Sequence, residues 1–273
     1  ALSAAAIGAA AVKPADVMYV YHPPATVALP ALTIHGIRRI PFVYDIQDLW
    51  PDTLSATGMV NNGYLVGIVD RWCRMVYRAA SKIVVLSPGF KEVLVHRSVP
   101  EEKIEVIYNW CDEGQIPKTP KNETLAKELG FSGRFNVLFA GTMGKAQALE
   151  AVLDAAGRVG GRIPEVQFVF VGGGIEVERL QRIARERRIN NVLFLPRRPV
   201  SEIGEVLNLA DVLLVHLKDD PLFRITIPSK IQAYLAVGRP ILVGVRGDAA
   251  DLVRAAGAGV DCLPENPESI SEA

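Results

Sequence analysis

The chain has 273 residues, of which 49% are hydrophobic and 22% charged, and its formal net charge at pH 7 is +0. This composition excludes an intrinsically disordered chain, and the length suits one large domain or two of ordinary size. The balanced charge gives no indication of a polyanionic partner, so we expect no nucleic-acid binding.

The cysteines and histidines are scattered along the chain. Cys73, Cys111 and Cys262 form no CxxC pair, and an odd count without such spacing predicts reduced thiols and a cytoplasmic protein. The four histidines show no HExxH or other metal-binding spacing. We therefore expect no protein-bound metal and no metal cofactor.

The chain begins with an apolar run, ALSAAAIGAAAV, that ends at Lys13. The run is too short to span a bilayer and lacks the charged start of a signal peptide. We interpret it as a packed helix of an α/β domain, with the end of a longer interfacial helix as the alternative. A start without Met and an end at ESISEA, which reads as the opening of a helix, lead us to expect a fragment lacking sequence at both ends.

The first half of the chain alternates short apolar strands with helices. Strands are predicted over residues 16–21, 41–45, 82–86 and 104–108, and helices over residues 25–37, 64–80 and 90–96. Polar residues follow two of the strands: His22 comes after the first, and Gln47 and Asp48 come after the second. Ligands bind beyond the carboxyl ends of parallel strands, so these three residues are candidates for a binding site.

A polar stretch with Pro117 and Pro120 separates the two halves and contains one short predicted helix over residues 124–129. Such a stretch is typical of an inter-domain connection. The predicted organisation is a domain over residues 1–115, a linker over 116–133 and a second domain over 134–273.

The second half repeats the alternation of strands and helices. Strands are predicted over residues 136–140, 166–171, 192–195, 212–216, 240–243 and 259–263, and helices over residues 148–159, 175–187, 200–209, 229–237 and 249–256. Ser201 and Ser229 are expected to cap two of these helices. Two such α/β runs predict two Rossmann-like domains with parallel sheets that face a cleft.

The segment 136–147, NVLFAGTMGKAQ, is the main candidate for a binding loop. It reads as a buried strand, a glycine turn at Gly141 and Gly144, and the first turn of a helix. Backbone N–H groups and the helix dipole at such a turn favour an anion. The alternative is an ordinary strand–helix turn whose glycines serve only close packing.

Three further strand ends in the second half could line the same site. They are the glycines 172–174, the segment 196–198, and the loop that leads to Lys230. Glycines allow a diphosphate to approach the backbone, and a helix start with a lysine supplies N–H groups and an ammonium. Together these features suit a nucleoside diphosphate.

The order of these motifs resembles the retaining glycosyltransferases of family 4, which have the two-domain GT-B fold. The resemblance rests on NVLFAGTMGKAQALEAVLDA, FVFVGGG, LFLPRRPVSE, ADVLLVHL and, most specifically, TIPSKIQAYLAVGRPIL. In the first half, YHPPATVAL, PFVYDIQDLWPDTLSATG, KIVVLSPGF and IEVIYNWCD look like the acceptor domain of one branch. That branch is similar to bacterial sugar transferases of O-antigen, capsule and colanic-acid assembly, including N-acetylfucosamine-type transferases.

The resemblance implies roles for residues on the donor side. Gly141 and Gly144 would frame the donor diphosphate. Ser229 and Lys230, with the backbone from Thr226, would bind its phosphates. On the far side of the site, Gly173 and the stretch at Arg197 would flank the nucleobase and ribose.

On the acceptor side, the resemblance implies that Asp48 approaches the acceptor hydroxyl or the transferred sugar. His22 would line the same cleft, and Gln47 stands where the family commonly has the histidine of a His-Asp pair. Asp48 is thus the candidate catalytic carboxylate of the first domain.

The chain departs from the family pattern at several donor-side positions. Thr142 and Gln147 stand where charged or amide residues are usual, and Ile225 and Ala233 occupy the positions of two glutamates. The cations that remain to stabilise a leaving diphosphate are Lys145, Arg224 and Lys230. The loop with Thr142 and Gln147 is then a neutral cradle, with Lys145 and Lys230 as catalytic candidates.

The function implied by the resemblance is transfer of a sugar from a UDP-sugar, with retention at the anomeric carbon. The sugar would be an N-acetylated hexosamine or a 6-deoxy relative, and the acceptor a polyprenyl-diphosphate-linked or other glycan. The protein would be cytoplasmic and peripheral on the inner face of a bacterial inner membrane. The alternatives are a nucleotide-sugar 2-epimerase of the same fold and a non-catalytic module that binds nucleotide sugars.

Overall fold

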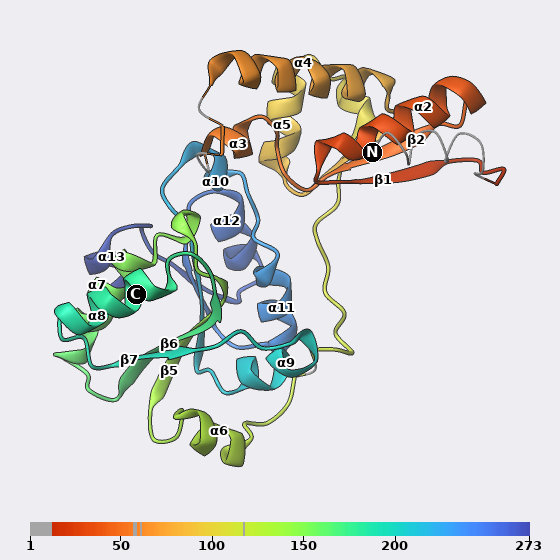
Figure 1. Ribbon diagram of the computed structural model, residues 1–273. Helices are drawn as coiled ribbons and strands as arrows, with labels where there is room; N and C mark the ends of the chain where they lie inside the picture. Colours follow the sequence, from red (N-terminus) through yellow and green to blue (C-terminus); the bar gives the residue numbers. More distant parts are fainter. Residues whose placement is uncertain (1–12, 57–58, 61, 117) are drawn as a thin grey trace. The chain divides into compact units, whose positions relative to one another are not determined.

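The computed structural model describes residues 13–56, 59–60, 62–116 and 118–273, and the chain divides into two compact units after Tyr108. Each unit contains one parallel sheet with helices packed on it (Figure 1). The helix predicted over residues 1–12 lies outside the described residues. The α/β class with two parallel sheets is confirmed.

The first unit has a four-stranded sheet in the order β1-β2-β3-β4, and all neighbouring strands are parallel. The strands are β1 (Met18–His22), β2 (Phe42–Ile46), β3 (Lys82–Val85) and β4 (Ile104–Val106). The helices are α2 (Ala28–Arg38), α3 (Asp52–Ala56), α4 (Gly63–Ala79) and α5 (Pro88–His96), with 3-10 turns at Ala25–Val27 and Glu101–Lys103.

Local sequence explains how these elements begin and pack. Helix α5 starts with Pro88 in its first turn, and the Ser87 side chain accepts a hydrogen bond of 3.1 Å from the Phe90 N–H. Helix α4 buries one face through Cys73, Val76 and Tyr77. The short helix α3 was not predicted, because its residues lie in a polar loop without helical periodicity.

The second unit has a six-stranded parallel sheet in the order β10-β9-β8-β5-β6-β7. The strands are β5 (Phe135–Thr142), β6 (Val166–Gly173), β7 (Val192–Leu195), β8 (Val212–His216), β9 (Ile241–Gly244) and β10 (Gly259–Asp261). The helices are α6 (Glu123–Leu129), α7 (Leu149–Gly160), α8 (Val177–Glu186), α9 (Val200–Asn208), α10 (Pro221–Arg224), α11 (Lys230–Val237), α12 (Asp248–Ala255) and α13 (Pro267–Glu272). Helices α7, α8 and α13 lie on one side of this sheet, and α9 and α11 lie on the other (Figure 1).

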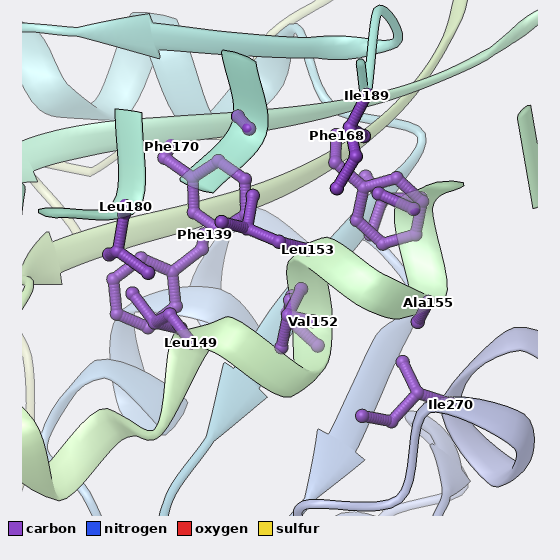
Figure 2. Packing of buried hydrophobic residues seen from close by; sticks show 14 of the residues in the cluster. Phe139, Leu149, Val152, Leu153, Ala155, Phe168, Phe170, Leu180, Ile189 and Ile270 are labelled. Atoms are coloured by element: carbon purple, nitrogen blue, oxygen red, sulfur yellow. The ribbon is translucent and has the colours of Figure 1, made fainter. Parts of the chain in front are cut away.

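The core of the second unit lies between the sheet and helices α7, α8 and α13. Figure 2 shows Phe139 of β5 and Phe170 of β6 packed against Leu149 and Leu153 of α7, with Ile270 of α13 nearby. All five side chains are at most 2% exposed. Burial of this apolar surface holds α7 against the sheet, and this fixes the loop between β5 and α7.

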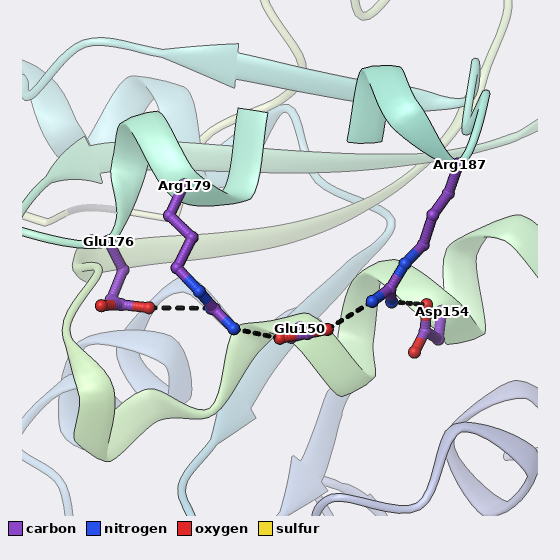
Figure 3. A network of polar contacts seen from close by, with 5 residues as sticks. All are labelled: Glu150, Asp154, Glu176, Arg179 and Arg187. Atoms are coloured by element: carbon purple, nitrogen blue, oxygen red, sulfur yellow. Dashed lines mark hydrogen bonds and ion pairs between the residues drawn. The ribbon is translucent and has the colours of Figure 1, made fainter. Parts of the chain in front are cut away.

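A surface network of ion pairs joins helices α7 and α8 (Figure 3). Glu150 accepts hydrogen bonds from both Arg179 and Arg187, Arg187 also contacts Asp154, and Arg179 lies 2.9 Å from Glu176. The hydrogen bond from Arg187, supported by Arg179, lowers the pKa of Glu150. Because the side chains are partly exposed, the network contributes little stability, but it ties the start of α8 to α7.

The structure corrects several local predictions. Strand β5 continues through Gly141 and Thr142, so Gly141 lies in the ladder and not in a turn. A separate 3-10 turn, Lys145–Gln147, precedes α7, which begins only at Leu149. Ser201 lies inside α9, whose N-terminal flanking residue is Pro199, and this helix has no side-chain cap.

Candidate functional site

The strand order places a gap at the carboxyl edge of the second sheet. Strand β5 pairs with β8 only at Val137 and Leu138, whereas its pairing with β6 continues to Thr142 opposite Gly173. After β5 the chain adds β6 and β7 on one side of the sheet, and after β8 it adds β9 and β10 on the other side. The crevice at such a reversal of strand order is where open α/β sheets bind ligands.

Tyr234 of α11 fills the buried part of this gap. Its hydroxyl accepts a hydrogen bond of 3.0 Å from the Ala140 N–H and lies 3.4 Å from the Ala140 carbonyl oxygen. Tyr234 is 1% exposed, and burial raises the pKa of its hydroxyl well above the usual range. The side chain thus replaces the partner that β8 no longer offers to β5.

Close packing of backbones explains two of the glycines at the strand ends. A Cβ at Gly172, whose φ is +148°, would lie 1.9 Å from the Gly141 carbonyl oxygen. A Cβ at Gly174 would lie 2.3 Å from the Met143 carbonyl oxygen. The neighbouring chain therefore requires glycine at these two positions. A Cβ at Gly173 would meet nothing within 4 Å, so space remains beside this residue.

Lys230 is a cation that lies beside the end of β5. It is the first residue of α11, its Nζ lies 3.7 Å from the centroid of the Phe139 ring, and a Cβ at Gly141 would lie 3.1 Å from the same atom. Burial lowers the pKa of Lys230 to about 7. No carboxylate pairs with it within the described parts of the chain. A desolvated, uncompensated ammonium beside a glycine is a suitable partner for an anion.

The loop after β5 is held together by its own side chains. Gln147 Oε1 accepts a hydrogen bond of 2.9 Å from the Gly144 N–H, and the Lys218 N–H donates to the Ala146 carbonyl oxygen at 2.8 Å. Thr142 and Lys145 are exposed. Gly144 and Gln147 are both predicted to bind the donor, but in the structure they are hydrogen-bonded to each other and determine the conformation of the loop.

The remaining donor-side residues occupy more peripheral positions. The Thr226 hydroxyl donates to the Leu222 carbonyl oxygen at 2.8 Å, so its side chain is engaged within its own turn. Ser229 stands at the N-cap position of α11 but is exposed and makes no side-chain cap bond, contrary to the prediction. Arg197 follows β7 and is exposed.

In the first unit, His22 lies in an aromatic setting at the end of β1. It is 2% exposed, and its ring centroid lies 5.7 Å from that of Tyr44 and 5.5 Å from that of Trp50. Burial lowers the pKa of His22 to about 4, so the imidazole is neutral. Its Nδ1 is buried and has no hydrogen-bond partner within the described residues.

Gln47 and Asp48 follow β2, and of these two side chains only that of Gln47 has a hydrogen-bond partner among the described residues. Gln47 Nε2 donates a hydrogen bond of 2.8 Å to the buried carboxylate of Asp45, which also accepts one of 2.6 Å from the Tyr19 hydroxyl. The Asp48 carboxylate is half-buried, and burial raises its pKa. Asp48 is the carboxylate of this edge that could meet an acceptor, whereas Gln47 is engaged with Asp45.

Three functional candidates were missed by the sequence patterns. Tyr234, His216 and Asp45 sit among apolar residues of a helix or strand, so their side chains read as core. A buried polar group in a strand or helix next to the carboxyl edge is the signal that could have identified them.

The described residues also bear on other classes of site. They contain no cluster of three or more His, Cys, Asp or Glu side chains arranged for a metal ion. Within the same residues, no helix combines the length and apolar character needed to cross a bilayer.

Models of two glycosyltransferase domains match the chain. The glycosyl transferases group 1 model matches residues 121–273, and the glycosyl transferase 4-like domain model matches residues 1–110. The chain belongs to the group 1 glycosyl transferases. The resemblance to family 4 and its GT-B fold, inferred from the sequence motifs, is confirmed.

Two relatives of this glycosyltransferase chain match over part of their length. WcaI of Escherichia coli, which carries the name of a colanic acid biosynthesis glycosyl transferase, is 27% identical over 72% of this chain and 49% of its own. The alpha-galactosylglucosyldiacylglycerol synthase of Streptococcus pneumoniae is 30% identical over 53% of this chain and 33% of its own. The chain therefore spans about half and about a third of the length of these two proteins.

Solved structures with low sequence identity share the fold. Anabaena HepE in complex with UDP has a TM-score of 0.80 at 18% identity, over 99% of this chain and 70% of HepE. HepE in complex with UDP and glucose has a TM-score of 0.77 at 19% identity, over 98% and 69% of the two chains. A glycosyltransferase from Rickettsia africae has a TM-score of 0.76 at 15% identity, over 99% and 69%.

Proposed function

We propose that this chain carries the donor site and part of the acceptor side of a glycosyltransferase that uses a UDP-sugar. The observation that carries the proposal is Lys230, a desolvated ammonium without a carboxylate partner within the described residues, at the parting of β5 and β8. The complexes of HepE with UDP and with UDP-glucose support UDP as the nucleotide. The family membership supports transfer as the reaction.

Negative charge develops on the diphosphate as its bond to the sugar breaks, and the protein must stabilise that charge. Lys230 would contact the diphosphate in the gap next to Gly141, and the exposed Lys145 would approach it from the loop after β5. Approach of a phosphate favours the charged form of Lys230, so the ammonium is restored as the donor binds. Asp48 would approach the acceptor hydroxyl or the transferred sugar.

The finer assignment is a retaining transfer of an N-acetylated hexosamine, or of a 6-deoxy relative, to a polyprenyl-diphosphate-linked or other glycan acceptor. The relative named for colanic acid biosynthesis supports a role in surface polysaccharide assembly. The relative named as a diacylglycerol-glycoside synthase supports an acceptor attached to a lipid.

A donor titration with a matched variant tests the proposal. UDP binding to the complete protein is measured by calorimetry for the unmodified chain, Lys230→Met and Lys127→Met, where Lys127 is an exposed lysine of α6. Loss of one charge-assisted contact of about 1.5–3 kcal/mol corresponds to at least a tenfold weaker affinity for Lys230→Met. Equal affinities of the two variants would exclude Lys230 from the donor site.

Transfer is tested separately with a panel of UDP-sugars and lipid-linked acceptors, with products identified by mass spectrometry. Donor binding without transfer to any acceptor would favour the non-catalytic module. Conversion of the donor to its 2-epimer without an acceptor would favour the epimerase. An Asp48→Ala variant that keeps full turnover would remove Asp48 from the acceptor side.

We further propose peripheral contact with the inner face of a bacterial inner membrane through helix α4. Its outward stripe exposes Tyr64, Ile68 and Met75, which are 77%, 50% and 45% exposed, and it also carries the exposed Arg71 and Arg78. These residues follow helical spacing and therefore share one face. Exposed apolar groups mixed with arginines suit an anionic bilayer surface.

Vesicle sedimentation tests this contact. Each arginine near an anionic surface contributes about 1 kcal/mol, so loss of both charges alone weakens binding to phosphatidylglycerol vesicles about 30-fold, and the double variant Arg71→Glu/Arg78→Glu should lose at least that much. The matched control reverses two exposed arginines of α8, Arg182→Glu/Arg185→Glu, and should bind as the unmodified chain does. Equal losses in both double variants would mean that overall charge, and not α4, determines binding.

A further inference from the structure

His216 is a buried polar residue at the carboxyl end of β8 that the proposed chemistry does not use. It is 1% exposed, and it pairs in register with Gly244 of β9. A Cβ at Gly244 would lie 2.4 Å from Cδ2 of the imidazole. The ring therefore occupies space that only a glycine on the neighbouring strand leaves open.

Both nitrogens of the imidazole have backbone partners. Nδ1 lies 2.7 Å from the Gln147 carbonyl oxygen, and Nε2 lies 3.1 Å from the Glu265 nitrogen. A carbonyl oxygen can only accept and a backbone N–H can only donate, so Nδ1 carries the proton and Nε2 accepts. Burial lowers the pKa of His216, which agrees with this neutral tautomer.

These two bonds, together with a third between Asp219 and Glu265, connect loops that follow three different strands. Gln147 closes the loop after β5, because its side chain holds the Gly144 N–H. Glu265 follows β10, and its carboxylate accepts a hydrogen bond of 2.7 Å from the Asp219 N–H in the loop after β8. The imidazole thus lies where the loops after β5, β8 and β10 meet.

We propose that His216 is a positioning residue of the donor site. Its Nδ1–H holds the Gln147 carbonyl oxygen and so fixes the loop 144–147 against the end of β8, where the loop can meet the diphosphate. His216 does not itself touch the donor. The inference rests on the proposed function, because the loop matters to affinity only if the donor binds beside it.

Two substitutions separate the hydrogen bond from the bulk of the ring. In His216→Asn, the side-chain amide can donate from about the position of Nδ1, whereas His216→Leu has no donor. The KM for the UDP-sugar should rise at least tenfold in His216→Leu with kcat changed less than threefold, and His216→Asn should recover most of that loss. Equal KM values in the two variants would overturn the proposal.

A matched control uses His96 on α5 of the first unit. Its Nδ1 also lies 2.8 Å from a backbone carbonyl oxygen, that of Glu92, but the residue is exposed. His96→Leu should leave the KM for the UDP-sugar unchanged. An equal rise in KM for His96→Leu and His216→Leu would show that the effect has no connection with the donor loop, and would overturn the proposal.

A spectroscopic measurement tests the inference even if the leucine variant fails to fold. The ¹⁵N spectrum of the histidine-labelled, unmodified protein should show His216 as the neutral Nδ1–H tautomer, and its signals should shift when UDP is added. An Nε2–H tautomer, or signals that do not respond while UDP binds, would overturn the proposal. Failure of the unmodified protein to bind UDP would instead refute the proposed donor site.

Discussion

Removal of the Tyr234 hydroxyl is the most direct test of how the gap between β5 and β8 is maintained. Tyr234→Phe keeps the ring and its packing in a site that is 1% exposed. It removes the acceptor for the Ala140 N–H at 3.0 Å and the weaker contact to the Ala140 carbonyl oxygen at 3.4 Å. The edge of β5 then has a buried donor without a partner.

The magnitude follows from the burial of that donor. An unsatisfied buried polar group destabilises a protein by about 1–3 kcal/mol, and the 3.0 Å bond is the one fully formed interaction lost. We therefore expect Tyr234→Phe to lower the free energy of unfolding by about 2 kcal/mol. For a domain of roughly 150–250 residues, this corresponds to a fall in Tm of about 4–8 °C.

Urea denaturation followed by circular dichroism measures the loss, and hydrogen exchange of the Ala140 amide shows where it arises. The denaturant slope should stay unchanged, while protection of the Ala140 N–H should fall. Tyr64→Phe, at a site 77% exposed, serves as the control and should be neutral. A change of less than about 0.5 kcal/mol in Tyr234→Phe would refute the idea that this hydroxyl supports the strand edge.

Further expectations concern the glycines, the lysine and the surface network. Gly172→Ala should destabilise the protein by about 3 kcal/mol or more in thermal melting, because its Cβ meets the Gly141 carbonyl oxygen and its φ is +148°. Gly173→Ala, whose Cβ meets nothing within 4 Å, should be near neutral in the same measurement. Since the pKa of Lys230 is about 7, the free lysine is largely neutral at pH 8 and a bound diphosphate restores its charge. UDP affinity should therefore fall as pH rises above 7, and calorimetry at pH 8 in buffers of different ionisation enthalpy should detect proton uptake that Lys230→Met abolishes. Arg187→Ala should reduce stability in urea by only about 0–1 kcal/mol, because the network in Figure 3 is partly exposed, and a loss above about 2 kcal/mol would contradict this view.

Much of the fold could be predicted because the strands are apolar and the helices are amphipathic. The predicted strands over 192–195 and 212–216 match β7 and β8, and the other predicted strands are displaced by only one or two residues at their ends. The sequence predicts that residues 141 and 142 lie outside β5, because a glycine at the end of an apolar run indicates a turn. In the structure, Gly141 has a positive φ, yet its backbone continues the ladder with β6. Ser201 was expected to cap α9, but the N-cap position is held by Pro199 and Ser201 is the second residue of the helix.

The sequence predicts where the candidate residues lie in the fold better than it predicts which groups they contact. Lys230 and Gly141, chosen from separate motifs, meet at the end of β5. Gln147 and Gln47 were expected to face ligands, yet each amide bonds to a neighbour within its own loop or strand end. The contact between Tyr234 and Ala140 spans 94 residues of sequence, and local periodicity carries no information about such a pair.

The hydroxyl that separates β5 from β8 also affects how a ligand would be recognised. Because Tyr234 fills the buried part of the gap in the free chain, β5 and β8 are already apart beyond Leu138, and a ligand does not have to separate them. Little conformational entropy is then lost on binding, and differences in affinity between ligands arise mainly from their dissociation rates. In the transfer that we propose, such a rigid site would bind the released UDP as readily as the UDP-sugar, so accumulating UDP would slow turnover.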